Sequence, residues 1–192
     1  EPSANLWPEA EASANHIIRA FYPQTDYPIH PPAMIISSIA CFYDLDDPNA
    51  FVAAIKRDLH PDGVWVVQMA DLGMMLEKNA FDNICHEHLE YYEAQTLNRL
   101  VTRHGLEIAS MSYNSVNGGS LRAIIRHATA DHGLIHWPDL PSRNITTFAT
   151  RIERLKGQTV AYLTRLRQEG RSVVGYGAST KGNTLLQYYG IG

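Results

Sequence analysis

The residues best suited to chemistry form one run, F-D-N-I-C-H-E-H-L-E-Y-Y-E, at positions 81–93. His86, Glu87 and His88 are consecutive, and an unperturbed imidazole titrates at about pH 6.5, so it can move protons near neutrality. A tyrosine pair that begins at Tyr91 adds aromatic faces able to hold a ring or a cofactor. Proton-transfer chemistry requires a general base oriented by a neighbouring group, and this run supplies both. We therefore interpret residues 81–93 as the reactive segment.

Two other interpretations of the histidines remain open. In an extended loop, residues two apart point the same way, so His86 and His88 could share a metal ion. The H-E-x-x-H spacing of zinc proteases and a CxxC pair are both absent, which weakens this interpretation. The histidines could instead be packed in a loop with Glu87 as a hydrogen-bond partner. We predict no metal in this chain.

The composition of the 192 residues is that of a globular protein, with 45% hydrophobic residues and a net charge of −4. Acids and bases are interspersed, whereas phosphate binding usually shows a basic stripe, so neither nucleic acid nor a membrane surface is an expected partner. Cys41 and Cys85 form no disulfide framework, which favours a reducing cytoplasm. No apolar run approaches the ~20 residues of a membrane span. The chain opens on Glu1 without Met, and we expect a fragment of a longer protein.

Ahead of the reactive segment, the patterns predict a helix and then a strand–helix–strand unit. Residues 9–21 carry a partial apolar face and predict a helix. The apolar run at 33–40 is typical of a parallel strand buried on both faces. Asp47 and Pro48 suit the cap and first position of a helix, and residues 64–69 predict a second buried strand. Short connections between these elements predict a βαβ unit.

Beyond the reactive segment, residues 94–104 predict a helix that ends at Gly105. The alternating stretches 106–111 and 120–126 flank an Asn-Gly-Gly turn, and they predict an antiparallel hairpin at a sheet edge. The turn is ordinary loop chemistry by default, although its glycines also suit close backbone approach to a ligand.

The last third of the chain predicts a linker at 128–144, a long helix at 145–168 and a strand at 171–176. A glycine loop and a further helix follow, so we expect a second α/β unit with a domain boundary near 130–145. The loop G-Y-G-A-S-T-K-G at 175–182 resembles a phosphate-cradling turn at a helix N-terminus. A plain strand–helix turn is an equally open interpretation.

Six segments carry a more specific signal. They are E-P-S-A-N at 1–5, S-S-I-A-C-F-Y-D-L at 37–45, L-H-P-D-G-V-W-V at 59–66, F-D-N-I-C-H-E-H-L-E-Y-Y at 81–92, V-N-G-G-S-L-R at 116–122 and G-Y-G-A-S-T-K-G-N-T-L-L at 175–186. In this order they resemble the sugar C-methyltransferase family, enzymes that use S-adenosylmethionine to methylate a nucleotide-linked keto-deoxysugar. The H-E-H-x-x-Y-Y and G-Y-G-A-S-x-K-G-N-T motifs are the specific part.

The resemblance implies an α/β fold, namely the second half of a Rossmann-like class I methyltransferase domain with an antiparallel edge hairpin. The start of a second α/β domain follows. We expect residues 1–130 to be the C-terminal part of the methyltransferase domain and 131–170 to be a linker and long helix. Residues 171–192 then begin a C-terminal domain that binds the nucleotide sugar. S-adenosylmethionine is the implied cofactor, and zinc is expected only in an N-terminal domain missing from this chain.

Site roles follow from the same resemblance. His88 resembles the catalytic base and Glu87 its acidic neighbour, and Glu1, Ser37 and Ser38 match cofactor-binding positions. The candidate substrate-binding residues are His86, Tyr91, Asn117, Ser120, Arg122, Tyr176, Ser179 and Lys181.

This chain departs from the family at three of its positions. Ser37 and Cys41 stand near a strand end where many relatives carry Asn and His, which alters polar contacts to substrate or cofactor. Cys85 replaces a tyrosine, so a phenol that could help hold the substrate oxygen is missing there.

The implied reaction is methyl transfer from S-adenosylmethionine to a carbon next to a ketone of a nucleotide-linked deoxysugar, after His88 has removed a proton to form the enolate. The alternatives are an O- or N-methyltransferase of another small molecule, which needs less help from a base, and a nucleotide-sugar-binding fragment without catalysis. The expected partner is a small-molecule nucleotide sugar. The sequence specifies neither the sugar and carbon nor the oligomeric state.

Overall fold

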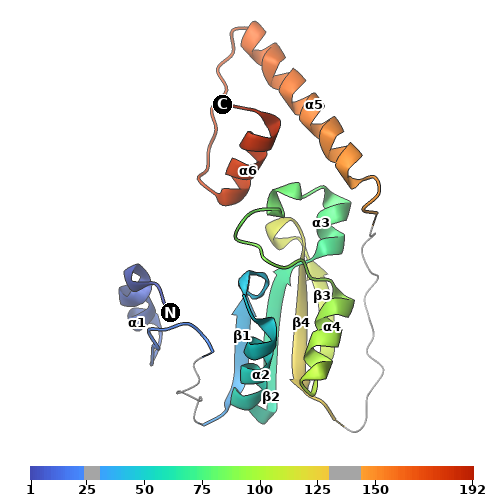
Figure 1. Ribbon diagram of the computed structural model, residues 1–192. Coiled ribbons are helices and arrows are strands. Elements are labelled where there is room, and N and C mark those ends of the chain that lie inside the picture. The colour runs from blue at the N-terminus through green and yellow to red at the C-terminus, as the bar shows by residue number, and fades with distance from the viewer. Residues whose placement is uncertain (24–30, 130–143) are drawn as a thin grey trace.

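The computed structural model describes residues 1–23, 31–129 and 144–192, and a four-stranded sheet forms its centre (Figure 1). The strands lie in the order β1-β2-β4-β3. Their bounds are Ala33–Ile39 for β1, Leu59–Ala70 for β2, Leu106–Asn114 for β3 and Ser120–His127 for β4. β1 runs parallel to β2, whereas β4 is antiparallel to both β2 and β3. The predicted hairpin is confirmed, with β4 inside the sheet and β3 at its edge.

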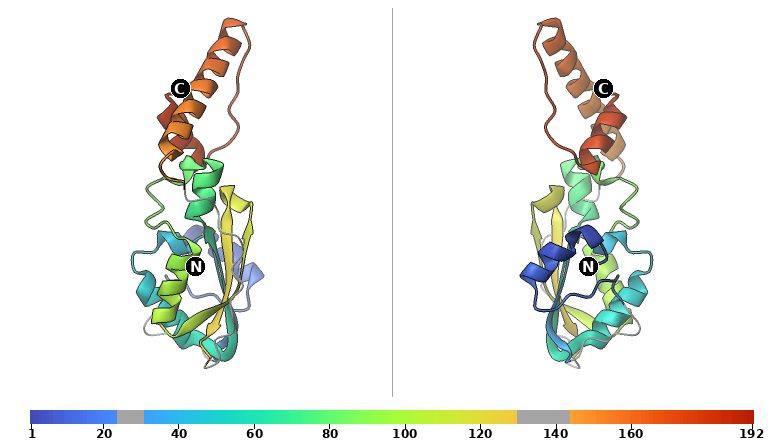
Figure 2. Two further views of the ribbon diagram at one scale, coloured as in Figure 1. Left: turned by 90° about the vertical axis from the view of Figure 1, so that its right-hand side faces the viewer. Right: turned by 90° about the vertical axis from the view of Figure 1, so that its left-hand side faces the viewer.

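Two helices cover one face of this sheet (Figure 2). α2 (Pro48–Asp58) connects β1 to β2, and the Asp47 carboxylate caps it by accepting a hydrogen bond from the Ala50 amide at 2.9 Å. α4 (Ala94–Arg103) leads into β3 and stops before Gly105, whose φ of +69° is a conformation that favours glycine. The predicted βαβ unit and both helices are therefore confirmed.

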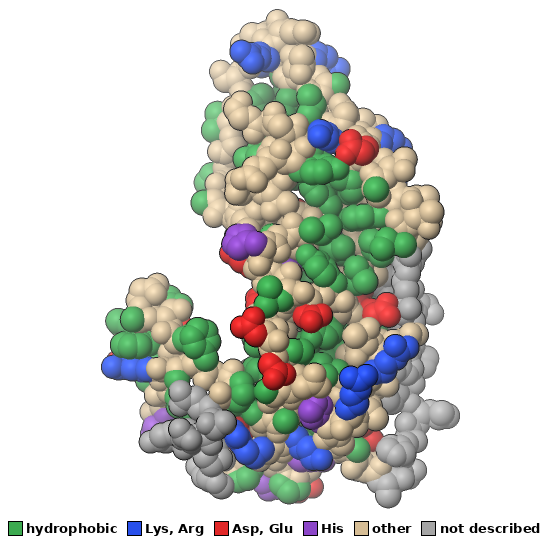
Figure 3. Space-filling model, in the orientation of Figure 1, with side chains coloured by type: hydrophobic (Ala, Val, Ile, Leu, Met, Phe, Trp, Pro, Cys, Tyr) green, Lys and Arg blue, Asp and Glu red, His purple; other side chains and the backbone are tan. Residues whose placement is uncertain are grey.

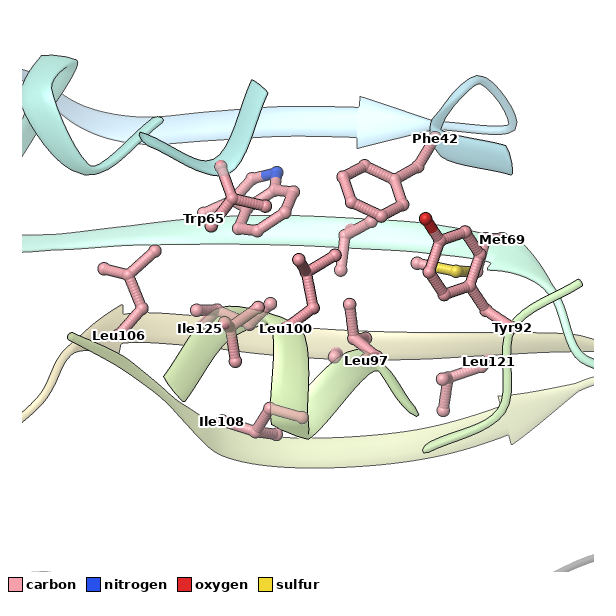
Figure 4. Close-up of a cluster of buried hydrophobic side chains, with 14 of the residues drawn as sticks. Phe42, Trp65, Met69, Tyr92, Leu97, Leu100, Leu106, Ile108, Leu121 and Ile125 are labelled. Carbon is pink, nitrogen blue, oxygen red and sulfur yellow. The ribbon is translucent and has the colours of Figure 1, made fainter. Parts of the chain in front are cut away.

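The main core lies between the sheet and these two helices (Figure 4). Trp65 is fully enclosed in it, and its indole N–H donates a hydrogen bond to the Ser38 hydroxyl at 3.0 Å. Alternate residues of each strand supply one side of this core, because successive side chains of a strand point to opposite faces. The other fully buried side chains include Phe42, Val52, Ile55, Val67, Leu97, Val101, Leu106, Leu121 and Ile125.

The sequence patterns missed one helix, α3 (Leu72–Lys78), which follows directly on β2. Asp71 caps it by accepting a hydrogen bond from the Met74 amide at 2.8 Å, and Asn79 ends it with a φ of +56°. A helix of seven residues is too short to show a clear apolar period. Met75 of this helix is buried. The other short elements are α1 (Trp7–Ser13) and the 3-10 turns Ala4–Leu6, Phe42–Asp44, Phe81–Asn83 and Val116–Gly118.

Two predictions for the first forty residues are wrong in part. The helix expected at 9–21 is the shorter α1, none of whose residues is buried, and helices gain most of their stability from a packed face. The strand expected at 33–40 forms as β1, but it is not buried on both faces. Met34, Ile35 and Ile39 are 53%, 70% and 51% exposed, because β1 is an edge strand of the described sheet.

α5 (Phe148–Gln168) and α6 (Thr180–Tyr189) form a separate unit beyond the carboxyl ends of β1 and β2, at the top of Figure 1. Both confirm predicted helices. The strand expected at 171–176 is wrong, since residues 171–179 have no regular structure and Tyr176 is fully exposed. A strand needs a neighbour that satisfies its backbone hydrogen bonds, and none of the described strands pairs with this segment.

A second, smaller cluster joins these two helices to the reactive segment. It consists of the buried residues Phe81, Ile152 and Tyr189, and the rings of Phe81 and Tyr189 stack with centroids 5.5 Å apart. The predicted linker and domain boundary fall largely in 130–143, outside the described residues, so the division into domains stays a prediction. Among the described residues, no helix is long and apolar enough to cross a membrane.

Candidate active site

The reactive segment lies over the carboxyl ends of β1 and β2. The Tyr43 carbonyl, shortly after β1, accepts hydrogen bonds from the amides of Leu89 and Glu90, both at 3.0 Å. The Tyr92 carbonyl accepts one at 2.8 Å from the Leu72 amide, shortly after β2. Doubly wound α/β folds bind their ligands at this edge of the sheet. Backbone hydrogen bonds therefore hold the segment where it can reach a ligand.

Two aromatic side chains anchor the ends of the segment in different clusters. Tyr92 packs in the main core, with its ring 5.2 Å from that of Phe42 (Figure 4). Phe81 packs in the small cluster against Tyr189. Both anchors are less than one tenth exposed. The residues between them, with their histidines, bridge the sheet body and the C-terminal helices.

His88 stands beside two residues that the sequence analysis did not select, Tyr43 and Asp44. The rings of His88 and Tyr43 have centroids 4.4 Å apart and planes inclined by 53°. Partial desolvation raises the pKa of the Asp44 carboxyl, while nearby His88 lowers it and nearby Glu87 raises it. A usable signal was present in the sequence, because Tyr43 and Asp44 follow the carboxyl end of a predicted parallel strand.

A hollow of about 230 Å³, counted with its open mouth, lies beside His88. Asn83 is buried there, and its side-chain oxygen has no hydrogen-bond partner among the described residues. Desolvation raises the pKa of the Tyr43 and Tyr91 phenols, so both keep their protons at neutral pH. One hollow thus brings together the His88 imidazole, two phenols and the Asn83 side-chain oxygen, and the Tyr91 phenol donates to the Asn83 carbonyl at 3.5 Å. Its lining residues are Tyr43, Ala70, Asp71, Leu72, Met75, Asn83, His88, Glu90 and Tyr91.

The first turn of α6 touches both the reactive segment and the Asn-Gly-Gly turn. The Thr180 hydroxyl donates a hydrogen bond to Oε1 of Glu87 at 3.1 Å. The Lys181 ammonium donates one to the Asn117 carbonyl at 3.3 Å. Among the predicted site residues, Glu87, Asn117 and Lys181 are thereby brought to one end of α6, and Thr180 is a residue that sequence reasoning missed.

An open groove of about 830 Å³, again counted with its mouth, separates the reactive segment from α6. His86 and Cys85 lie on the segment side, and Asn183 and Gln187 lie on the α6 side. The last two were not selected from the sequence, although their i, i+4 spacing places them on one face of a predicted helix. The complete lining is Ile84, Cys85, His86, Thr180, Asn183, Thr184, Gln187 and Tyr188. Within the described ranges, no group of three or more His, Cys, Asp or Glu residues is placed to hold a metal ion.

The Asn-Gly-Gly turn approaches α3 closely. Asn117, Gly118 and Gly119 have φ values of +53°, +85° and +130°. A Cβ added at Gly119 would stand 2.5 Å from the Met74 Cβ. Ser120 is buried, and its hydroxyl donates a hydrogen bond to a carbonyl of the same turn at 2.8 Å. The glycines therefore serve a backbone contact with α3, and a substrate contact of Asn117 or Ser120 stays a prediction.

The predicted cofactor-binding residues lie on the β1 side of the molecule. Ser37 is exposed near the end of β1, whereas Ser38 is buried with its hydroxyl bonded to Trp65. The Glu1 carboxylate accepts a hydrogen bond from the Ser3 amide at 2.7 Å, in an N-terminal segment that lies beside β1 (Figure 1). Of the three candidates, Ser37 alone presents an exposed hydroxyl at the ligand-binding edge.

Three predicted substrate-binding residues are placed in other ways. Arg122 on β4 donates a hydrogen bond to the Gln68 side chain at 2.9 Å. Ser179 caps α6 by accepting a hydrogen bond from the Gly182 amide at 3.1 Å. Tyr176 extends into solvent from the irregular segment before α6. A binding role for each of the three stays a prediction.

Two family models match the chain. Residues 4–111 match a methyltransferase domain, which is more than half of the 192 residues. Residues 141–192 match a C-methyltransferase C-terminal domain. The two matches follow one another in the order that the sequence motifs predicted.

One curated relative and one solved structure extend this comparison. The C-methyltransferase NovU of Streptomyces niveus is 31% identical over 174 residues, which are 85% of this chain and 41% of that protein. The chain thus spans about two fifths of the length of this relative. An S-adenosylmethionine-dependent methyltransferase from Clostridium acetobutylicum ATCC 824 superposes with a TM-score of 0.53 at 10% identity, covering 67% of this chain and 74% of that one. At this identity the superposition shows the fold alone, and it confirms the predicted Rossmann-like fold.

Proposed function

This chain belongs to the methyltransferase family, and we propose that its protein transfers a methyl group from S-adenosylmethionine to a carbon next to a ketone of a nucleotide-linked deoxysugar. Carbon methylation is supported by the match to a C-methyltransferase C-terminal domain and by the identity with NovU. The sugar substrate is supported by the sequence motifs and by the polar groove described above. The observation that carries the proposal is the position of His88, over the sheet edge and beside a hollow lined by phenols.

A carbon next to a ketone becomes nucleophilic only when it loses a proton. In the proposed reaction, His88 takes this proton and an enolate forms. Tyr43 lines the same hollow and keeps its own proton, so it is suited to donate a hydrogen bond to the enolate oxygen, whereas the Tyr91 hydroxyl donates to the Asn83 carbonyl at 3.5 Å. The loss of one such donor costs about 2.7–4 kcal/mol in comparable sites.

S-adenosylmethionine, when bound, supplies the methyl group on a positively charged sulfur. The surroundings of His88 suit a cation, because Asp44 and Glu87 both lie close to it. Figure 3 shows acidic side chains in the middle band of this face, between the sheet body and the C-terminal helices. Ser37 has an exposed hydroxyl at the end of β1, whereas the hydroxyl of Ser38 is buried and accepts a hydrogen bond from the Trp65 indole. The acidic side chains near His88 and the Ser37 hydroxyl therefore fit the positively charged sulfur and a polar group of the cofactor.

The groove beside α6 is the proposed place for the nucleotide sugar. Side-chain amides of Asn183 and Gln187, with the hydroxyl of Thr184, supply both donors and acceptors along it. Such a lining suits a ligand with several hydroxyl groups. Lys181 at the same helix end is suited to a phosphate, because the partner of its ammonium group among the described residues is a neutral carbonyl, that of Asn117.

The test is proton exchange in the full-length protein that carries this sequence. His88→Ala is expected to abolish exchange of the sugar α-proton with deuterated solvent, measured by NMR of the nucleotide sugar. His104→Ala is the matched control, since that imidazole bonds Asn49 at the far end of α4. Undiminished exchange in His88→Ala would remove His88 as the base. A product that carries the new methyl group on oxygen or nitrogen would show that the enzyme is an O- or N-methyltransferase and would contradict carbon methylation.

A further inference from the structure

α6 is tied to the reactive segment at two places far apart in the sequence. At its C-terminal end, Tyr189 stacks on Phe81 with ring centroids 5.5 Å apart. At its first turn, Thr180 bonds Glu87, a residue 93 positions earlier in the chain. Because both ends of the helix are held, the Thr180 hydroxyl has a defined position relative to the segment.

Glu87 has a side chain whose position its own backbone does not fix. Its side chain is exposed on an irregular loop, where a glutamate samples several rotamers. Within the described part of the chain, the Thr180 hydroxyl is the hydrogen-bond donor that its carboxylate meets. A donor on a packed helix selects one of these rotamers, so the charge of Glu87 is held in one place beside its neighbour His88.

The geometry on the other side of His88 makes this placement relevant. The Tyr43 ring lies against the imidazole, and Asp44 lies close to both His88 and Glu87. The imidazole thus has two carboxylates near it, and they repel one another. Without a partner, Glu87 could turn away from Asp44 and from His88, whereas the bond to Thr180 keeps its charge at a constant distance from the imidazole.

We propose that Thr180 is a positioning residue for the reaction: its hydroxyl holds the Glu87 carboxylate beside His88, so that docking of α6 and proton abstraction by His88 are coupled. The inference rests on the proposed function, because it assigns Thr180 to the same proton transfer. It adds a residue of the C-terminal helix that touches neither substrate nor reacting atoms in this role. Its effect is transmitted through one hydrogen bond.

The experiment compares Thr180→Val with Thr180→Ser in the full-length protein. Val keeps the shape of Thr without its hydroxyl, and Ser keeps the hydroxyl. Val is expected to lower both kcat and the α-proton exchange rate about tenfold, the rate equivalent of one hydrogen bond to a charged group. KM for S-adenosylmethionine and the melting temperature are expected to stay unchanged. Ser is expected to restore kcat to within about twofold of the unchanged protein, a difference well below the effect of one hydrogen bond.

Thr164→Val is the matched control, because the Thr164 hydroxyl bonds a carbonyl of its own helix, α5, at 2.8 Å. It is expected to leave kcat unchanged. Glu87→Ala supplies a second measurement: the double variant with Thr180→Val is expected to be no slower than Glu87→Ala alone, because either change removes the Thr180–Glu87 hydrogen bond.

Two results would overturn the inference. Thr180→Val with the kcat of the unchanged protein would show that the hydroxyl does nothing for the reaction. Thr180→Ser as slow as Thr180→Val would show that the methyl group, and hence packing, is what matters. Either result leaves the role of His88 intact when His88→Ala still abolishes exchange, so failure of the inference is distinct from failure of the proposed function.

Discussion

The sheet body and the C-terminal helix pair hold the reactive segment from opposite ends, but they bury very different amounts of apolar surface. The body encloses a continuous core in which Trp65, Leu97 and Ile125 have no exposed surface. The C-terminal pair contributes two buried side chains, Ile152 and Tyr189, which pack against Phe81 of the reactive segment. Local opening requires less free energy where fewer apolar contacts are lost.

The candidate site therefore lies between a tightly packed sheet body and a loosely packed pair of C-terminal helices. Tyr92 belongs to the sheet body, and it carries the hydrogen bond from Leu72 that fixes the segment over β2. Glu87 faces the helix pair through Thr180. A substrate entering between them would meet a fixed sheet edge and a helix that can separate from it.

The largest expected effect comes from the body. Trp65→Ala removes a fully buried indole and leaves a cavity in the main core, so the free energy of unfolding should fall by about 3–5 kcal/mol. Urea denaturation followed by circular dichroism measures this loss. Trp65→Phe, which keeps an aromatic ring, should cost clearly less. A loss below about 1 kcal/mol for Trp65→Ala would contradict the view of the body as a single tight core.

A second prediction concerns the C-terminal helix pair. Phe81→Ala should cost about 3 kcal/mol, the low end for a buried ring, and should release α6 while the sheet stays folded. Hydrogen exchange is the measurement, with faster exchange expected in α6 and unchanged exchange in β2 and β4. Phe21→Ala is the control, because that ring is 78% exposed. Faster exchange across the whole chain would mean that the two regions unfold together.

The smallest expected effect on stability concerns the N-terminal segment, which is attached to the sheet body at Tyr22. Tyr22 is attached to the body by an edge contact with Phe51 and by a hydrogen bond from its hydroxyl to the buried Asp58 at 3.0 Å. Tyr22→Phe keeps the ring and removes this bond, so unfolding should become easier by about 1.5 kcal/mol at pH 7. Tyr162→Phe on exposed α5 should change nothing measurable.

The pH dependence of Tyr22 has a definite sign. Burial, together with the bond to Asp58, raises the pKa of its phenol above the usual value of about 10. The folded state therefore keeps a proton that the unfolded state loses, so this stabilisation is complete below about pH 10 and declines as the pH rises above it. Melting temperatures from pH 8 to 11 should fall less steeply for Tyr22→Phe. Parallel curves would contradict the assignment.

Sequence reasoning predicted those parts of the fold that local patterns determine. Asp47 and Pro48 marked the start of α2, and Gly105 marked the end of α4, because caps act on their own helix. The hairpin followed from alternation around the Asn-Gly-Gly turn. His88 was selected from residue type and motif alone; the structure places its segment over the carboxyl ends of β1 and β2, and its catalytic role stays a prediction.

The remaining features depend on contacts that no local pattern records. Asp44 approaches His88 because two loops converge on one sheet edge, and Thr180 meets Glu87 only after α6 has packed on Phe81. The strand expected at 171–176 lacked a partner, which its own residues could not reveal. The exposure of Ile35 follows from strand order rather than from composition.

Gly119 limits which amino acids this sequence can accept at position 119. Its φ of +130° excludes nearly all side chains, and the Cβ of Met74 occupies the space that a replacement would need. Position 119 should therefore rank among the least tolerant in a saturation-mutagenesis screen, although no feature of it belongs to the chemistry. A screen that scores activity would find position 119 as intolerant of substitution as we expect for His88. A screen that scores protein abundance would separate them, because substitutions at Gly119 remove the folded protein and substitutions at His88 leave it.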